Sequence, residues 1–170
     1  MPPDNRPTSP EDEFGLPPIN FDSAMSFTSK PIGDAFDYWN GLRDGRLMPD
    51  LPEVKLTDMR PFLPFIGLVE IRTRPDRSSG YFVTLAGAAV ESIFGSRAGR
   101  WLDEDVPDAI ASRWRLGFDM VRRSAKPVKA TAHVAFEGKT NIGAEILVAP
   151  LGDGDTPRAF LVAIASVDTI

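Results

Sequence analysis

Cysteine is absent from the 170 residues of this chain, and histidine occurs once, at His133. Without cysteine the chain cannot form disulfides, zinc–thiolate sites or iron–sulfur clusters, and it has no thiol for catalysis. A single histidine also excludes a Cys–His pair and a two-histidine metal site. Most of the usual inventory of metal and nucleophilic chemistry is therefore missing.

Other absences narrow the class further. No apolar run approaches the roughly 20 residues that span a bilayer, and the N-terminus is acidic and rich in proline where a signal peptide would be basic and then apolar. We therefore expect a cytoplasmic protein. The net charge is −5 and the basic residues are scattered, which argues against nucleic-acid binding because phosphates need a concentrated positive surface. No phosphate-binding glycine loop and no Gly-x-Ser-x-Gly elbow is present.

Three regions are predicted along the chain. Residues 1–19 have too few apolar side chains to offset the entropy of ordering, so we expect a disordered tail. Residues 20–64 contain a helix over 34–43, capped by Asp34 and ended by Gly45, and then a proline-rich connector. Residues 65–170 form the main domain.

The main domain alternates short apolar segments with turns, and it contains one long helix, in which Ile110, Trp114, Phe118 and Val121 recur at helical spacing. Its predicted elements are strands over 66–73 and 81–86, helices over 88–94 and 106–123, and strands over 127–136, 141–150 and 158–167. We therefore predict an α+β fold with a five-stranded antiparallel sheet, flanking short helices, one long helix and the N-terminal helix. The last strands are apolar on both faces, so each face of the sheet needs a cover.

Several short motifs surround the first two strands. They are Tyr38-Trp39, Leu42-Arg43, Gly45-Arg46 and Met48-Pro49 ahead of the sheet, and Leu85-Ala86-Gly87 and Gly99-Arg100-Trp101-Leu102 after it. This set resembles a bacterial family of stand-alone PAS-like domains, by motif over residues 34–102 and by segment order elsewhere. The resemblance implies a PAS-like fold and a role in signal transduction. Thr84 stands where that family more often has arginine, so the resemblance itself provides no cation for an anionic ligand there.

Two PAS chemistries are excluded by composition, because a cysteinyl–flavin adduct and a thioester-linked chromophore both need a thiol. Haem is disfavoured, since strand alternation places His133 on the face away from the expected pocket. The cofactor is otherwise unknown.

Apolar side chains are expected to converge between the sheet and the helices, either as a filled core or as the wall of a ligand pocket. Both interpretations remain open from the sequence. The candidate pocket residues are Tyr81, Val83, Leu85, Ile93, Phe94, Trp114, Phe118, Val134, Phe136, Ile146 and Ile164.

The resemblance implies output through a partner protein, with PAS-containing sensor kinases of two-component systems as natural candidates. A homodimer is also compatible with the sequence, because the second apolar face of the sheet needs either the N-terminal helix or a second subunit as its cover. The candidate partner-binding residues are Phe36, Trp39, Arg43, Arg46, Arg97 and Arg100. Each arginine can instead cap a helix carbonyl or pair with a nearby carboxylate. We expect a binding module with no enzymatic activity. The alternatives are a sensor of a small apolar ligand and, with less support, a small α+β enzyme using the strand carboxylates Glu70 or Glu145.

Overall fold

The computed structural model describes residues 17–136 and 139–167. Most of the predicted tail (residues 1–16), the turn residues Glu137 and Gly138, and the last three residues lie outside the described residues. The side chains of residues 134–142 are likewise outside the description. None of the helices in the described part of the chain is long and apolar enough to cross a membrane.

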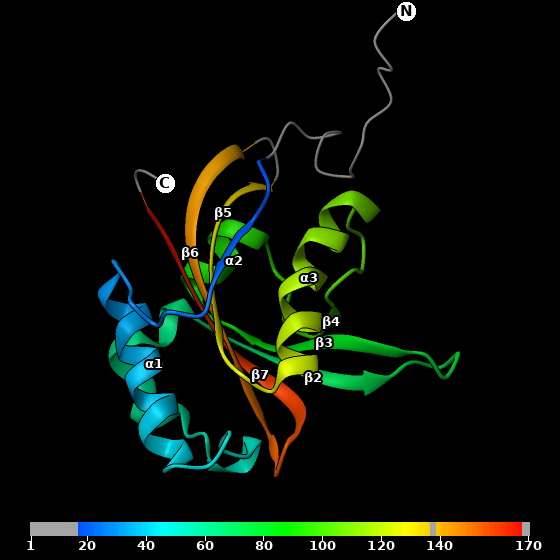
Figure 1. Cartoon of the computed structure of the whole chain (residues 1–170). Helices are drawn as coiled ribbons and strands as arrows, with labels where there is room; N and C mark the ends of the chain where they lie inside the picture. The colour runs from blue at the N-terminus through cyan, green and yellow to red at the C-terminus, as the bar shows by residue number, and fades with distance from the viewer. Residues whose placement is uncertain (1–16, 137–138, 168–170) are drawn as a thin grey trace, which may run out of the picture.

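One antiparallel sheet organises the described residues, with its strands in the spatial order β1-β5-β6-β7-β2-β3-β4 (Figure 1). The strands are β1 Asn20–Asp22, β2 Ile66–Thr73, β3 Ser79–Ala86, β4 Arg100–Trp101, β5 Val128–Phe136, β6 Lys139–Asp153 and β7 Thr156–Ser166. The five inner strands are those predicted from the sequence. The two edge strands, β1 and β4, were not predicted, because segments of three and two residues are too short to show an alternating pattern.

Three α-helices and two 3-10 helices flank the sheet within residues 17–136 and 139–167. They are α1 Lys30–Arg43, α2 Ala88–Phe94, α3 Asp108–Ser124, η2 Leu51–Glu53 and η3 Leu56–Phe65. Helix α2 has the predicted bounds, whereas α1 begins four residues before the predicted cap, Asp34. The Asp34 side chain lies inside the helix and forms an ion pair with Lys30 at 2.7 Å. The predicted α+β fold with one antiparallel sheet is confirmed, and the described residues form seven strands in place of five.

Helix α1 covers one face of the sheet, together with η3 (Figure 1). The residues of β6 and β7 that face it include Leu147, Leu151 and Leu161, all fully buried. The indole Nε1 of Trp39 donates a hydrogen bond of 2.8 Å to the Pro150 carbonyl oxygen on β6. This contact explains why the meander strands are apolar on both sides: one of their covers is the N-terminal helix of the same chain.

The opposite face of the sheet packs against α2 and α3 (Figure 1). Alternation along β7 sends Phe160, Val162 and Ile164 to this side. The Phe160 ring meets Tyr81 and Phe118 with centroids 5.7 and 5.1 Å away, distances at which edge-to-face aromatic pairs are favourable. The two apolar clusters therefore make a three-layer arrangement, with helices on both sides of the sheet.

Gly87 joins β3 to α2 at a point where no side chain fits. A Cβ built there would lie 2.4 Å from the Pro64 carbonyl oxygen and 2.5 Å from that of Leu63. The Gly87 amide also donates a hydrogen bond of 2.8 Å to the Ile66 carbonyl. The glycine of the Leu-x-Gly motif thus allows α2 to start directly beneath the end of η3, which positions α2 over the sheet.

Candidate functional site: a cavity between the sheet and helices α2 and α3

A cavity of about 110 Å³ lies between the sheet and helices α2 and α3. Its wall is almost entirely apolar: the polar side chains that line it, among the described residues, are those of Arg97 and Arg113. A pocket of this kind, apolar with a few convergent polar groups, is the usual form of a small-molecule site.

Most of the predicted pocket residues line this cavity. Val83, Leu85, Phe94, Trp114, Phe118, Ile146 and Ile164 all do so, whereas Tyr81 and Ile93 are buried in the surrounding cluster. The hydroxyl of Tyr81 donates to the Asp119 carboxylate, and burial together with that hydrogen bond raises its pKa to about 12. The side chains of Val134 and Phe136 lie outside the described residues.

The N-terminal segment supplies a wall that the sequence did not predict. Ile19 and Phe21 line the cavity, and β1 pairs with β5 through Phe21 opposite Ala130. Gly117 of α3 lies against this segment, since a Cβ built there would be in ordinary van der Waals contact with the Phe21 ring, at 3.5 Å. Ile19, the last residue of the predicted 1–19 tail, therefore belongs to the site.

Arg113, on α3, links the N-terminal segment to strand β5 through hydrogen bonds. It is only 5% exposed, and it donates hydrogen bonds to the carbonyl oxygens of Pro17 at 2.9 Å and His133 at 3.0 Å. The position of Arg113 in the sequence indicates this buried role. Arg113 lies three residues after Ile110 and four before Gly117, inside the apolar stripe of the long helix, where an arginine is out of place unless it has buried partners.

Arg97 follows α2 and also lines the cavity. It is 8% exposed, so it does not belong to an exposed partner-binding surface as the sequence suggested. One terminal nitrogen donates a hydrogen bond of 2.9 Å to the Glu104 carbonyl oxygen, while Nε is buried with no hydrogen-bond partner. Burial and the neighbouring Arg100 lower the pKa of Arg97, against the opposing effect of Glu104 and Asp105.

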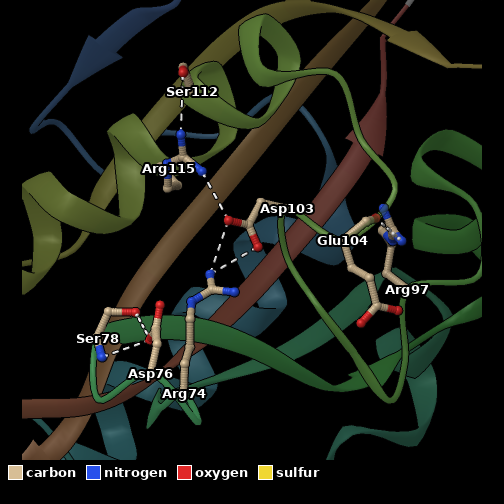
Figure 2. A network of polar contacts seen from close by, with 8 residues as sticks. All are labelled: Arg74, Asp76, Ser78, Arg97, Asp103, Glu104, Ser112 and Arg115. Carbon is tan, nitrogen blue, oxygen red and sulfur yellow. Dashed lines mark hydrogen bonds and ion pairs between the residues drawn. The ribbon is translucent and has the colours of Figure 1, made fainter.

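The loop that holds Arg97 is anchored by Asp103 (Figure 2). Arg74, directly after β2, donates to both oxygens of the Asp103 carboxylate at 2.9 and 3.0 Å. Arg115 of α3 approaches the same group at 3.2 Å, and the Arg74 guanidinium lies 4.5 Å from the centroid of the Trp101 ring. Because Asp103 precedes Glu104, this network fixes the carbonyl group that orients Arg97.

The other candidate partner-binding residues lie away from the cavity. Arg43 and Arg46 close the C-terminal end of α1: Arg43 donates to the Arg46 carbonyl at 2.8 Å, and Arg46 donates to the Leu42 carbonyl at 2.9 Å. Arg46 also pairs with Glu53, and the exposed Arg100 lies near Glu104 and Asp105. Phe36 is half-buried in the α1 cluster. Trp39, 2% exposed, is a core residue, which corrects its prediction as a surface contact.

The residues considered for haem ligation or catalysis do not line the cavity. Ala132 faces it, so strand alternation directs the neighbouring His133 to the opposite face of β5. Glu145 contacts the start of α1, and Glu70 pairs with Arg72 at 3.0 Å. Among residues 17–136 and 139–167, no group of three or more His, Asp or Glu side chains is placed to hold a metal ion.

No protein-family model matches the chain, and a search of curated proteins finds no match. Solved structures with a similar arrangement include an RNA-binding light-oxygen-voltage receptor, with 17% identity and a TM-score of 0.46. The match covers 88% of this chain but only 38% of that receptor. A fungal light-oxygen-voltage (LOV) domain photoreceptor has 14% identity and a TM-score of 0.42, with 82% of this chain and 95% of the photoreceptor covered. Membership in the bacterial PAS-like family stays a prediction.

Proposed function

We propose that the protein is a PAS-type sensory module that binds a small, largely apolar ligand in the cavity and acts by contact with a partner protein. The observation that carries this proposal is the cavity itself, about 110 Å³ in volume with apolar walls. Apolar cavities of about 150 Å³ stay dry and take up molecules such as benzene. A volume of this order suits a ligand of one aromatic ring or a short branched chain.

The proposed signal route begins at the edge strand β1. Only three residues of β1 pair with β5, and short edge elements are among the least stable parts of a fold. Since Ile19 and Phe21 touch the cavity, a ligand there would change the position or order of this strand. The proposed partner is a cytoplasmic signalling protein such as a PAS-containing sensor kinase of a two-component system. In this proposal the module acts by binding, without catalysis.

The proposal is tested by filling the cavity. Ala132 is 3% exposed and lines it, so Ala132→Leu should occupy part of the space, whereas Ala24→Leu makes the same change at an exposed position. Toluene should raise the melting temperature of the wild type and of Ala24→Leu, and should have no effect on Ala132→Leu. Native mass spectrometry of the purified protein would report any retained molecule and the subunit number. If toluene leaves all three proteins unchanged and no molecule is retained, the cavity is a packing defect and the proposal is wrong.

A further inference from the structure

The guanidinium group of Arg97 is incompletely satisfied. Its side chain is 8% exposed, its Nε–H has no acceptor, and it forms no ion pair with any residue that the structure describes. The one acceptor that it has, the Glu104 carbonyl oxygen, carries no net charge. Arginine remains protonated in proteins, so the positive charge is present at the cavity wall.

Burying the charge and the Nε–H donor of Arg97 costs free energy unless a further group accepts the hydrogen bond and balances the charge. A buried charge normally has a counter-ion and hydrogen bonds, and a buried donor without an acceptor loses its hydration without compensation. Arg100 adds a second positive charge near Arg97. The carboxylates of Glu104 and Asp105, which lie close to Arg100, offset part of this positive charge. An anion inside the cavity would accept the hydrogen bond from Nε and balance the charge.

Arg97 is the better candidate of the two cavity arginines. Arg113 already donates to the carbonyls of Pro17 and His133 and so has a structural role in holding the N-terminal wall. Arg97 is also positioned in advance, because its Glu104 contact sits next to the Asp103 carboxylate that Arg74 and Arg115 hold (Figure 2). A group fixed in this way binds an anion without first losing side-chain entropy.

The rest of the wall limits the anion to a small carboxylate with an apolar body. The wall is made of aliphatic side chains such as Val69, Val83 and Val162. Surfaces of this kind favour a hydrocarbon ring or a branched chain. A phosphate dianion would need several donors, whereas a carboxylate can be held by one guanidinium group.

We propose that the ligand of this cavity is a small apolar monocarboxylate whose carboxylate accepts a hydrogen bond from Arg97 Nε. This inference rests on the proposed function and specifies the chemical class of its ligand. It makes Arg97 the residue that selects acids over neutral molecules of the same shape.

The test compares acids with their neutral amides. The probes are benzoate with benzamide, and 3-methylbutanoate with 3-methylbutanamide, so that two body sizes are covered. Dissociation constants are measured by calorimetry for the wild type, Arg97→Gln, Arg97→Lys and the matched control Arg100→Gln, which removes an exposed charge from the same loop. In the wild type and in Arg100→Gln, at least one acid should bind roughly 10- to 100-fold more tightly than its amide, the range expected for a buried charge-assisted hydrogen bond. That preference should disappear in Arg97→Gln.

A direct readout comes from the nitrogen-15 NMR signal of the Arg97 Nε–H group, assigned by its loss in Arg97→Lys. The acid should move this proton signal downfield, and the amide should move it much less. This signal tests for contact between the ligand carboxylate and Arg97 Nε–H in the wild type, so it remains informative even if Arg97→Gln fails to fold. If acids and amides bind equally to the wild type, or if the Nε–H signal does not move, the assignment of Arg97 is wrong while the cavity proposal stands. If none of the four probes and no toluene binds, the proposed function fails as well.

Discussion

Glu145 accepts a hydrogen bond of 2.9 Å from the backbone amide of Ser29, which lies 116 positions earlier in the chain. Its other carboxylate oxygen accepts one of 3.0 Å from Thr28. Ser29 is the N-cap of α1 and makes no side-chain capping bond of its own. A buried carboxylate on β6 therefore caps the helix, and its negative charge also suits the positive end of the helix dipole.

The first prediction concerns this cap. Glu145→Ala would leave two backbone amides without their acceptor, and it would leave Lys129, whose Nζ is 3.4 Å from the carboxylate, without its charge partner. We expect a loss of about 3 kcal/mol in the free energy of unfolding, measured by urea denaturation. Glu70→Gln, which breaks the more exposed pair with Arg72, is the control and should cost less than about 1 kcal/mol. Equal effects of the two changes would contradict a capping role.

The second prediction concerns the pH dependence of this contribution. Burial, the largest influence, raises the pKa of Glu145, but the hydrogen bonds from Thr28 and Ser29 and the nearby Lys129 together lower the pKa below its ordinary value of 4.5. A lowered pKa in the folded state adds stability above the unfolded pKa, and this stability is lost as the pH falls through the folded value. The advantage of the wild type over Glu145→Gln should therefore be constant from neutral pH down to about pH 5 and shrink below it. Parallel stability curves down to pH 3 would show that the carboxylate titrates normally.

Local patterns predicted the regular elements well. Strand β2 and helix α2 have the predicted bounds, because proline, a polar turn and the glycines Gly87 and Gly95 delimit them in the sequence itself. The two-sided apolar pattern of β7 correctly required a cover on each face, and α1 is one of these covers. The apolar part of the cavity followed from the same alternation.

Long-range contacts could not be predicted in this way. The Glu145 cap joins segments with no shared pattern, and the short strands β1 and β4 are defined only by their partners. Arg97 lies in a Gly-Ser-Arg segment typical of an exposed turn, and only the folded loop directs it inward. These features depend on tertiary placement, which a single sequence does not encode locally.

The third prediction tests whether Asp103 holds the loop of Arg97. Asp103→Asn keeps the shape of the side chain but removes the charge that Arg74 and Arg115 share. Because these groups are partly exposed, the free energy of unfolding should fall by only about 1 kcal/mol. Hydrogen exchange should nevertheless increase in residues 97–106 and not in the distant strand β6. Unchanged exchange in 97–106 would mean that the network does not order the loop.

The fourth prediction uses Trp114 as a reporter of the cavity. Its indole lines the cavity and meets the Phe94 ring edge-on with centroids 5.1 Å apart, whereas Trp39 is buried against α1's side of the sheet. A ligand in the cavity should change the tryptophan fluorescence of the wild type, and Trp114→Phe should remove this change while toluene or benzoate still binds by calorimetry. Trp39→Phe is the matched control and should keep the response. A response that persists in Trp114→Phe would place the ligand elsewhere.

The fifth prediction separates the arginines of the surface from that of the cavity. Arg43, Arg46 and Arg100 remain candidates for partner contact, although Arg46 also closes the end of α1 and pairs with Glu53. Arg100→Ala should reduce capture of PAS-containing sensor kinases by the immobilised protein and leave the melting temperature unchanged, because its ion pairs with Glu104 and Asp105 are exposed. Arg46→Ala should lower the melting temperature, since two helix carbonyls lose their donor.

Arg97→Ala should alter ligand binding, and it should affect capture of the kinases only through the ligand. If the combined Arg43, Arg46 and Arg100 variant captures the same kinases as the wild type, these arginines are structural and the partner surface lies elsewhere.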